Sequence, residues 1–543
     1  MSFPACDVLG QPTRVSSRPA SVAEIRAAEQ PLLDAQSSRD ELMRSAASAV
    51  AGVAQSMLGG PEALIDATSH PHILVLAGGG GNGGDGLYAA AMLLEQGWTR
   101  VSVYRLSSSV HEPAWQRCVA AGGVVVDNLD ELEAVDLVID AITGIGARPG
   151  LRPDAAEAMR RVRGAQVLAV DIPSGVAADS GQEGEEHVRA DVTVSFGAPR
   201  MAHALSAACG RVLIADIGLD SPAQPSLSEL MTHHQQGRRG RRVVRAVHDP
   251  EGLYLEGFKV VGEHSGIADI TPGAGDDKYS GGVVGIVAGS ERYLGAGLLS
   301  TTAAVRASSS MVRYVGDARQ AVVERLPEVV CHPSLSECGR VQCVVVGPGR
   351  GTDEAALQEL LTVLSMDVPV VVDADAITLL AGSQRAREML QQRSAYTLLT
   401  PHAGEFRRLA AALESEITDL DEDRVHACED MAAALGVAVL CKGRSTIIAD
   451  ASATTIVDAG CSWAATAGSG DVLAGIIGAH LAWAHATQRV AASDAVVAAV
   501  LVHAVAAELA AQTPYGTAPT SATMIAEAIP AATAALIAHG SSI

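Results

Sequence analysis

The sequence predicts an α/β protein of two domains, each built on a parallel sheet covered by helices. Short apolar strands alternate with helical segments along most of the chain, which is typical of a parallel sheet buried on both faces. Hydrophobic residues make up 48% of the sequence and aromatic residues only 3%, so Ala, Val, Leu and Ile must build the cores. With 543 residues, the chain has room for two or three domains of about 100–200 residues each.

The charge of the chain argues against broad nucleic-acid binding. The formal net charge is −23, whereas a nucleic-acid-binding protein needs a basic face. One basic island, Arg238-Arg239-Gly240-Arg241-Arg242, interrupts the acidic background. We interpret it as a solvated linker rather than as a nucleic-acid site.

Cysteine usage and hydropathy favour a cytoplasmic protein with no membrane partner. The nine cysteines are scattered and form no CxxC pair or Cys/His cluster, which is typical of reduced, buried thiols. The N-terminus has no charged segment followed by an apolar stretch, so no signal peptide is expected. The apolar run from Ala495 to Ala507 is interrupted by His503 and is too short to span a bilayer, so we expect a buried helix.

The order of elements defines the expected domains. Residues 1–20 are predicted to form a flexible arm, residues 21–225 a first domain, residues 226–250 a linker without apolar periodicity, and residues 251–543 a second domain. In the first domain, helices are expected from Ser21 and over 40–57 and 86–96, and strands at 73–76, 101–104, 124–126, 137–139 and 167–170.

A glycine-rich loop, Gly78 to Gly86, is predicted between the first strand and its helix. Its glycines match the dinucleotide pattern GxGxxG by spacing. That pattern needs a carboxylate about 20 residues later to hold the ribose, and Tyr104 and Arg105 stand there instead. A standard hydride-transfer site is therefore disfavoured.

Two further loops follow predicted strands, Asp140 to Gly146 and Asp171 to Gly175. Because the carboxyl ends of parallel strands line one crevice, these loops should converge with the glycine loop. The side-chain oxygens of Asn82, Asp140 and Ser174 could then share a cation. Alternatively, the aspartates only cap their loops, although three polar strand ends together favour a site.

These three loops together resemble the NAD(P)H-hydrate epimerase family over about residues 20–225. The resemblance implies a Rossmann-like three-layer domain that interconverts the R and S epimers of hydrated NADH or NADPH. By motif match, Asn82, Asp140 and Ser174 would bind potassium, and Asp171 would be catalytic. The substrate-binding positions implied are Gly81, Asn82, Gly83, Gly84, Asp85, Gly144, Ile145, Gly146, Ala147, Arg148, Pro149, Gly150 and Asp171. Gly81 stands where the family usually has a second asparagine.

In the second half, the stretch from Ala467 to Asp471 is the strongest candidate site. Gly468 and Gly470 flank Ser469 and can fold the backbone N–H groups into an anion-binding nest. The helix predicted to follow points its positive end at the same place. Asp471 at the mouth could take a proton from a hydroxyl that attacks phosphorus. The alternative is an ordinary glycine-rich turn.

Other polar motifs of the second half also follow predicted strands, so they should face one cleft with Asp471 beneath it. A helix of small residues is expected from Tyr293 through Met311. The strand ends carry Gly289-Ser290, Gly347 to Gly351, Asp373 to Ala376, Pro401 to Glu405, and Lys442 to Thr446.

In this order, the motifs resemble the ADP- or ATP-dependent NAD(P)H-hydrate dehydratases, a ribokinase-like α/β/α family, over about residues 250–540. The resemblance implies Asp471 as the catalytic base, magnesium, and ADP or ATP as co-substrate. Implied nucleotide contacts are Lys442, Gly443, Arg444, Ser445, Thr446 and Gly470; implied hydrate contacts are Ala296, Gly349, Gly351, His402 and Asp471. Ser469, Ala403 and Asp277 depart from the family's usual threonine, proline and histidine.

The two resemblances together imply a repair enzyme for hydrated nicotinamide nucleotides. The hydroxyl of the S hydrate would be phosphorylated and phosphate then expelled, while the first domain epimerises the R form. The expected partners are NADHX or NADPHX and ADP or ATP, in a homo-oligomer of four or more subunits. Two alternatives stay open: a ribokinase-like small-molecule kinase that stops after phosphorylation, and a first domain that only binds.

Overall fold

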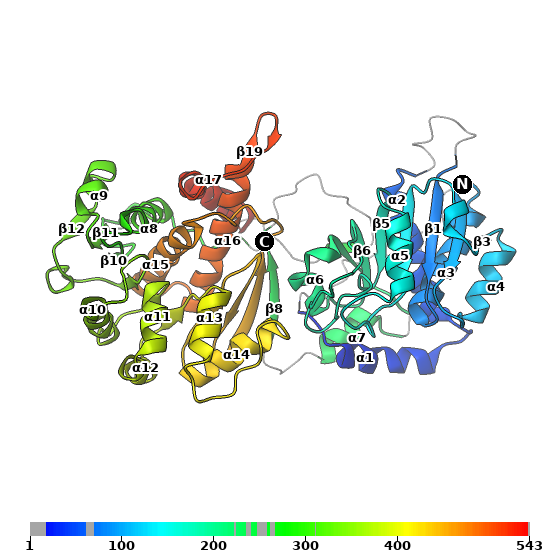
Figure 1. Ribbon diagram of the computed structural model, residues 1–543, viewed down its shortest axis with the longest axis horizontal. Helices are drawn as coiled ribbons and strands as arrows, with labels where there is room; N and C mark the ends of the chain where they lie inside the picture. The colour runs from blue at the N-terminus through cyan, green and yellow to red at the C-terminus, as the bar shows by residue number, and fades with distance from the viewer. Residues whose placement is uncertain are drawn as a thin grey trace. The chain divides into compact units, whose positions relative to one another are not determined.

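The structure is a computed structural model that describes residues 18–60, 70–221, 224–234, 240–246, 258–260, 266–309 and 311–540. Its chain divides into two compact units. The N-terminal unit contains residues up to 238 together with 250–261, and the C-terminal unit contains 239–249 together with 262–543. Each unit has its own sheet and its own hydrophobic core, which confirms the predicted α/β class (Figure 1).

The N-terminal unit is built on an eight-stranded sheet in the order β3-β2-β1-β4-β5-β6-β7-β9. All neighbouring strands are parallel except β9, which runs antiparallel to β7. The strands are β1 (His72–Ala77), β2 (Arg100–Arg105), β3 (Val124–Val126), β4 (Leu137–Ala141), β5 (Gln166–Val170), β6 (Val192–Phe196), β7 (Arg211–Ala215) and β9 (Phe258–Val260). The helices are α1 (Val22–Ala35), α2 (Glu41–Met57), α3 (Gly81–Glu95), α4 (Glu112–Ala120), α5 (Pro153–Arg161), α6 (Met201–Leu205) and α7 (Leu227–His234).

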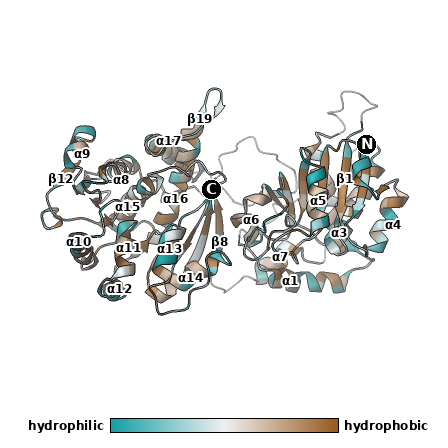
Figure 2. Ribbon diagram, in the orientation of Figure 1, coloured by the Kyte–Doolittle hydropathy of each residue, from teal (hydrophilic) through white to brown (hydrophobic). Residues whose placement is uncertain are grey.

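Strand β1 shows why this sheet is buried on both faces. Successive side chains of a strand point to opposite faces. Ile73 and Val75 belong to the core cluster that also holds residues of α2 and α3, whereas Leu74 and Leu76 belong to the cluster that holds Ala155 and Ala158 of α5. The three-layer arrangement therefore follows from a strand that is apolar from Ile73 to Ala77, and β1 is correspondingly mostly hydrophobic in Figure 2.

The C-terminal unit is built on a ten-stranded sheet in the order β12-β11-β10-β13-β14-β15-β16-β17-β18-β8. Pairing is parallel from β12 to β16, antiparallel at β16–β17 and β17–β18, and parallel again at β18–β8. The strands are β8 (Gly240–Arg245), β10 (Val283–Val287), β11 (Met311–Val315), β12 (Val330–His332), β13 (Cys343–Val346), β14 (Val370–Val372), β15 (Thr397–Leu399), β16 (Ala438–Cys441), β17 (Ser445–Ala449) and β18 (Ala453–Asp458). A small separate hairpin pairs β19 (Gln512–Thr513) with β20 (Gly516–Thr517).

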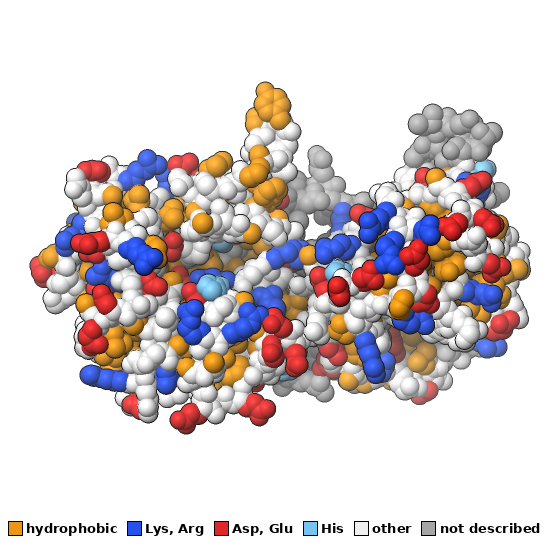
Figure 3. Space-filling model, in the orientation of Figure 1, with side chains coloured by type: hydrophobic (Ala, Val, Ile, Leu, Met, Phe, Trp, Pro, Cys, Tyr) orange, Lys and Arg blue, Asp and Glu red, His pale blue; other side chains and the backbone are white. Residues whose placement is uncertain are grey.

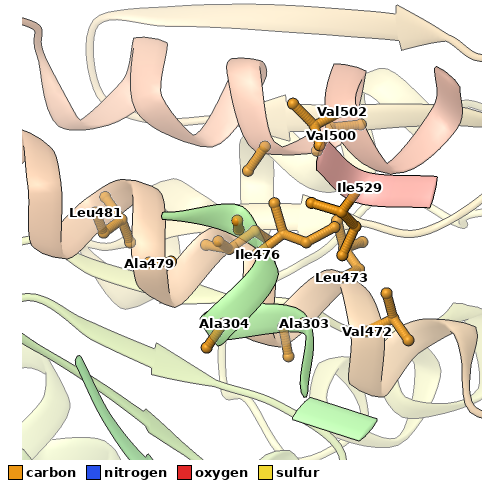
Figure 4. Close-up of a cluster of buried hydrophobic side chains, with 14 of the residues drawn as sticks. Ala303, Ala304, Val472, Leu473, Ile476, Ala479, Leu481, Val500, Val502 and Ile529 are labelled. Atoms are coloured by element: carbon orange, nitrogen blue, oxygen red, sulfur yellow. The ribbon is translucent and has the colours of Figure 1, made fainter. Parts of the chain in front are cut away.

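Helices of the C-terminal unit cover its sheet and build most of its core. They are α8 (Leu294–Ala307), α9 (Arg319–Arg325), α10 (Glu354–Leu364), α11 (Asp375–Gly382), α12 (Gln384–Gln391), α13 (Ala403–Ala410), α14 (Arg424–Leu435), α15 (Ser469–Thr487), α16 (Ala492–Ala511) and α17 (Ala522–Gly540). Figure 4 shows small and branched side chains of α8, α15, α16 and α17 meeting in one cluster. Alanine on these helices lets their backbones approach closely, as the composition predicts.

Helix α16 contains the apolar run predicted to be buried. The helix has 20 residues, so it is longer than the predicted run from Ala495 to Ala507. By this length and by its mean hydropathy of 1.8, it could cross a membrane. However, 78% of this stretch is buried inside the unit, where it packs on α15 and α17. The prediction of a buried core helix is confirmed.

The predicted linker, residues 226–250, contains regular structure. Helix α7 belongs to the N-terminal unit, and β8 pairs with β18 at the edge of the C-terminal sheet. The sequence did not indicate this strand, because a run of arginines is typical of a solvated segment. In the structure these arginines have partners: Arg241 contacts Glu429 at 2.7 Å and Arg242 contacts Asp494 at 2.7 Å. Charges of both signs are interspersed over both units in Figure 3.

The chain then returns to the first sheet. Strand β9, which lies inside the predicted second domain, pairs with β7 of the N-terminal unit. Residues 1–17 of the predicted arm lie outside the described residues. The end of that arm is anchored, because Ala20 is fully buried and its N–H donates to the carbonyl of Pro199 at 2.8 Å.

Two predicted helix boundaries are wrong. Helix α3 begins at Gly81 rather than Gly86, so most of the predicted glycine loop is helical. Glycine is a poor helix former, but here packing decides: a Cβ on Gly83 would lie 2.1 Å from the carbonyl oxygen of Gly78. Helix α8 ends at Ala307, and Met311, which we expected in the helix, begins β11.

Two candidate active sites

In the N-terminal unit, the predicted cation ligands Asp140 and Ser174 are in direct contact. Asp140 is the last residue but one of β4 and is fully buried. Its carboxylate accepts hydrogen bonds from the N–H of Ser174 at 2.8 Å, from the Ser174 hydroxyl at 2.7 Å and from the N–H of Ile142 at 3.3 Å. Burial raises the pKa of Asp140 to about 6, while these hydrogen bonds act in the opposite direction.

The third predicted ligand, Asn82, lies in the first turn of α3 beside Gly144. A Cβ on Gly144 would be 2.8 Å from Asn82 Oδ1 and 3.3 Å from Asp171 Oδ2, so only glycine fits between them. The buried Asn82 Nδ2 has no hydrogen-bond partner among the residues that the structure describes. The donors to Asp140 are neutral, and the three side chains carry a carboxylate, an amide and a hydroxyl, which are the oxygen groups that hard cations prefer.

Asp171 follows β5 in a strained backbone conformation, with φ at 66°. Its carboxylate accepts a hydrogen bond from the Ser195 hydroxyl at 2.7 Å and contacts the Arg200 guanidinium at 3.3 Å. The ring of His203 bonds the Asp171 carbonyl at 2.8 Å. Arg200 is the largest fully buried side chain among the described residues and also donates to the carbonyl of Ala198. These contacts fix the position of the Asp171 carboxyl group.

Two more acids face Asp171. Burial, and then the charges of Asp171 and Glu29, raise the pKa of Asp85 well above its ordinary value. Burial likewise raises the pKa of Glu29 on α1, although Arg200 partly opposes the shift. The site therefore gathers three carboxyl groups, and burial makes two of them, Asp85 and Glu29, bind a proton more tightly than usual, which is suited to moving a proton to and from a substrate.

The remaining predicted positions lie at the start of α3 and in the loop after β4. Within the first turn of α3, Gly83 and Gly84 are buried and Gly81 is exposed. In the loop after β4, Ile145, Ala147 and Gly150 are half-buried, and Gly146, Arg148 and Pro149 are exposed. The loop is held in place at its end, where the N–H of Gly150 donates to the carbonyl of Gly175 at 2.9 Å.

In the C-terminal unit, the predicted nest forms the start of α15. Gly468 is the N-cap residue with φ at 83°, a conformation that favours glycine. Asp471 is the acidic residue of the first turn. Ser469 shares a 2.9 Å hydrogen bond with Nε2 of the buried His503, whose pKa burial lowers to about 4. A neutral imidazole thus holds the serine. The Ser469 N–H donates to the carbonyl of Thr466 at 3.2 Å, so among the described residues the N–H groups of Gly470 and Asp471 are the ones in this turn that can bind an anion.

Lys442 lies directly at this helix start. A Cβ on Gly470 would be 3.3 Å from Lys442 Nζ. Lys442 pairs with the buried Asp373, which also accepts a hydrogen bond from the Thr400 hydroxyl at 2.7 Å. Burial disfavours the charge of Lys442, but Asp373 outweighs that effect and the pKa of the ammonium is raised. The lysine is therefore a fixed cation beside the nest.

The electrostatics of Asp471 fit a general base. Burial first, and the negative charge of Asp373 second, raise its pKa to about 6, while Lys442 opposes the shift and Asp375 adds to it. A base with a pKa near the working pH is effective, because it is ionised yet still accepts a proton readily.

The predicted hydrate contacts surround the same strand ends. Gly349 has φ at 58°, and a Cβ there would lie 2.7 Å from the Ala296 side chain. The N–H of Gly351 donates to Asp375 at 2.8 Å. Between Asp373 and Asp375, Ala374 has φ at 50°, a conformation that L-residues rarely adopt. This strain places both carboxylates at the end of β14.

His402 caps helix α13. Its ring nitrogen Nδ1 accepts from the N–H groups of Gly404 at 2.9 Å and Glu405 at 3.3 Å, and Glu405 accepts from the N–H of His402 in return. The His402 side chain is 59% exposed, so it can still meet a substrate. The preceding residue, Pro401, accepts from the N–H of Lys442 at 3.0 Å, which joins this loop to the lysine.

The predicted nucleotide segment, Gly443 to Thr446, follows Lys442 into strand β17. Thr446 donates to the carbonyl of Gly443 at 3.1 Å, and Arg444 contacts Asp458 at 3.3 Å. Arg424 of α14, which the sequence did not single out, donates to the carbonyl of Ser445 at 3.1 Å. Gly443 is exposed, so the turn is open to a ligand.

Comparisons with known proteins agree with both halves of this geometry. A family profile described as NAD(P)H-hydrate dehydratase matches residues 284–531, and one described as YjeF-related protein N-terminus matches residues 39–202. The bifunctional NAD(P)H-hydrate repair enzyme of Corynebacterium glutamicum is 43% identical over 95% of this chain and 98% of its own. The chain belongs to the family of bifunctional NAD(P)H-hydrate repair enzymes.

The chain is also similar to two further proteins. The enzyme of the same name from Mycobacterium tuberculosis is 42% identical over 85% of this chain and 88% of its own. A solved ADP/ATP-dependent NAD(P)H-hydrate dehydratase from Bacillus subtilis, co-crystallised with ATP and Mg²⁺, is 24% identical over 48% of this chain and 94% of that one, with a TM-score of 0.40. Both resemblances predicted from the sequence are confirmed at the level of the family.

Some residues of this repair enzyme's two sites had no sequence signal. Arg200 and Glu29 lie outside any motif, and only the fold brings them to Asp171. Asp373 and Asp375 did have a signal, because they stand at a predicted strand end, but we gave them no role. Among the described residues, no three His, Cys, Asp or Glu side chains converge as a preformed metal site.

Proposed function

We propose that the two sites divide the repair of hydrated nicotinamide nucleotides between them. The family gives the chain dehydratase and epimerase activities on NAD(P)H hydrates. In our proposal the N-terminal unit interconverts the R and S epimers of NADHX or NADPHX, and the C-terminal unit converts the S epimer to NADH or NADPH at the expense of ADP. The proposed boundary between the two activities lies in the segment 239–261, where the chain passes between the units.

The observation that carries the dehydratase proposal is Asp471 beside the nest and Lys442. Asp471 would take the proton of the hydrate hydroxyl while that oxygen attacks the terminal phosphorus of the nucleotide. The N–H groups of Gly468 and Gly470 and the Lys442 ammonium would stabilise the charge of the transferring group. The phosphate ester then leaves as phosphate and the ring double bond is restored. Phosphate leaves far more readily than hydroxide, which explains the use of a nucleotide.

The same geometry supports the proposed cofactors. Magnesium would be bound mainly through the nucleotide phosphates, with Asp373 or Asp375 nearby, because Mg²⁺ commonly takes one or two carboxylates and substrate phosphates as ligands. Potassium would be held by Asn82, Asp140 and Ser174, where it would balance the buried Asp140. Asp171 would exchange the substrate proton in epimerisation.

We also propose a cytoplasmic enzyme that forms a homo-oligomer of four or more subunits. The eight cysteines within the described residues are all free, which suits a reducing compartment. Measuring the mass of the protein in solution would test the oligomer, and a monomer would contradict it.

A test of the main proposal is to supply each purified hydrate epimer with ADP or with ATP and to follow recovery of the reduced-nicotinamide absorbance. The S epimer should be consumed by the dehydratase alone. Consumption of the R epimer requires the epimerase, so it reports whether Gly81 is tolerated. If the nucleotide is consumed and a stable phosphorylated product accumulates, the protein is instead a small-molecule kinase. If only the R epimer persists, the N-terminal unit is a binding module.

A further inference from the structure

Two exposed tyrosines flank strand β10, one beyond each end. Tyr279 precedes the strand and is 49% exposed, and Tyr293 follows it and is 47% exposed. Each ring is paired with a cation: Lys278 Nζ lies 5.1 Å from the Tyr279 ring centroid, and the Arg292 guanidinium carbon lies 5.2 Å from that of Tyr293. Because the carboxyl ends of parallel strands line the crevice that binds ligands, the pair that follows β10 is on the side of the C-terminal site.

Tyr293 borders the residues that we propose as hydrate contacts. A Cβ on Gly349 would lie 2.7 Å from the Ala296 side chain and 2.8 Å from Cβ of Tyr293. The Tyr293 carbonyl also accepts from the N–H of Ala296 at 3.2 Å. The tyrosine therefore extends the surface formed by Gly349 and Ala296, and the inference below rests on the dehydratase function proposed for that surface.

The turn that carries Tyr293 is held in place from two sides. The Tyr293 N–H donates to the carbonyl of Ser290 at 2.9 Å and closes the turn. The N–H of Gly289 donates to the carbonyl of Pro348 at 2.8 Å, and the Arg350 guanidinium donates to the carbonyl of Gly289 at 3.0 Å. A ring on a fixed turn loses little freedom when a ligand binds, so more of its stacking energy contributes to affinity.

The position of Tyr293 along α8 indicates which part of the hydrate it meets. Leu299 of this helix lies at the nest, since a Cβ on Gly468 would be 2.6 Å from Leu299 Cδ1. Tyr293 caps the helix six residues earlier, which corresponds to about 9 Å along its axis. The hydrated nicotinamide ring must lie at the nest, beside Asp471, to be phosphorylated. The group that reaches Tyr293 therefore comes from the other half of the dinucleotide, its adenosine.

Arg292 brings a positive charge to the same place. Its side chain is exposed and forms no ion pair with a described residue, whereas the nearby Arg350 pairs with Glu359 at 2.6 Å. A guanidinium can stack its face on an aromatic ring and still bind a phosphate through its edge. NADPHX carries a 2′-phosphate on its adenosine and NADHX does not, and an arginine commonly binds this group.

We propose that Arg292 and Tyr293 bind the adenosine end of the hydrate and make the C-terminal unit prefer NADPHX to NADHX. The Tyr293 ring stacks on the adenine, and the Arg292 guanidinium pairs with the 2′-phosphate. Stacking acts on both hydrates, while the charge acts only on the phosphorylated one.

Dehydration kinetics of the full chain with the purified S epimers of NADPHX and NADHX separate these two effects. Arg292→Gln should raise the KM for NADPHX by about 3- to 10-fold and leave the KM for NADHX unchanged. Tyr293→Ala should raise both by about tenfold, because a base loses its stacking partner, and Tyr293→Phe should keep the wild-type values. The kcat and the KM for ADP should stay near those of wild type in all three variants, since the reacting end of the site is untouched.

The pair at the other end of β10 provides matched controls. Lys278→Gln and Tyr279→Ala make the same changes on the opposite side of the sheet and should alter neither KM. The proposal is overturned if active wild type has equal KM values for the two hydrates, if Arg292→Gln affects both hydrates equally, or if Tyr293→Ala raises the KM for ADP instead.

Binding of the products, followed by calorimetry, distinguishes this proposal from the dehydratase function itself. Wild type should bind NADPH more tightly than NADH, and Arg292→Gln should weaken only the binding of NADPH. That result in a protein that turns over neither hydrate would support the adenosine site and contradict the dehydratase function. Turnover of both hydrates without any effect of Arg292→Gln would support the dehydratase function and contradict the adenosine site.

Discussion

The two candidate sites each depend on a buried aspartate whose pKa burial raises to about 6, but the charges around these aspartates differ. Asp140 in the N-terminal unit is surrounded by the neutral donors Ser174 and Ile142. Asp471 in the C-terminal unit lies near the fixed cation Lys442 and two further aspartates. Both sites thus bury a carboxylate. A positively charged lysine lies near Asp471, whereas the described hydrogen-bond donors to Asp140 are all neutral.

This difference explains why similar strand-end aspartates suit different tasks. A buried carboxylate with neutral donors alone is costly unless a cation joins it, which is why we propose Asp140 as a cation ligand. In the other site, Lys442 is already paired with Asp373, which leaves Asp471 free to accept a proton. Backbone strain accompanies both arrangements, at Asp171 and at Ala374.

Asp471→Asn should break the C-terminal site most severely. The amide keeps the shape of the carboxylate but cannot accept the proton, so dehydration should fall by about 10²–10⁴-fold. ADP binding, measured by calorimetry, should remain nearly unchanged, and epimerisation serves as the internal control. Turnover within threefold of wild type would remove Asp471 from the mechanism.

Asp140→Ala should act on the other site only. Loss of this negative charge should lower potassium affinity and epimerisation by about 10- to 100-fold, while consumption of the S epimer stays normal. Each epimer is supplied separately, in potassium and in a large organic cation. Asp154→Ala, at an exposed aspartate of the same unit, is the matched control. A variant that still consumes the R epimer at the wild-type rate would contradict the cation site.

Lys442→Ala tests whether the fixed cation serves the nucleotide. Loss of a charge-assisted contact to phosphate should raise the KM for ADP and for ATP by about tenfold. The KM for the hydrate should change little. The opposite pattern, an unchanged nucleotide KM with weaker hydrate binding, would reassign Lys442 to the other substrate.

The pH profile of dehydration should show the smallest effect. Asp471 works as a carboxylate, and its pKa is raised to about 6. The rate should therefore rise with pH, reach half its maximum near pH 6 and fall about tenfold per unit below it. The residual activity of Asp471→Asn should lack this dependence. A flat profile between pH 5 and 7 in wild type would mean that another group is the base.

The fold was predictable where apolar pattern alone decides the structure. Strands such as β1 and β13 are uninterrupted apolar runs, and α16 is apolar all round, so their burial could be inferred. Strand β8 was missed because Arg241 and Arg242 look like a solvated charge run until Glu429 and Asp494 are found nearby in space. Long-range ion pairs of this kind leave no local signal.

The sites were predictable where residues follow strands directly. Asp140, Asp171 and Lys442 all stand at the carboxyl ends of parallel strands, and topology brings such ends together. Arg200 reaches Asp171 from a loop 29 residues later, and Glu29 comes from a helix that precedes the sheet. Their contributions depend on tertiary packing, which spacing along the chain does not encode.

The exchange of strands between the units limits how this protein can be divided. The chain enters the C-terminal sheet as β8 and returns to the N-terminal sheet as β9 before it continues. A single cut anywhere between these strands gives the first fragment a strand that belongs to the second, and the second fragment a strand that belongs to the first. A single crossover that separates the two activities therefore leaves at least one sheet a strand short, and one between β8 and β9 leaves both sheets a strand short.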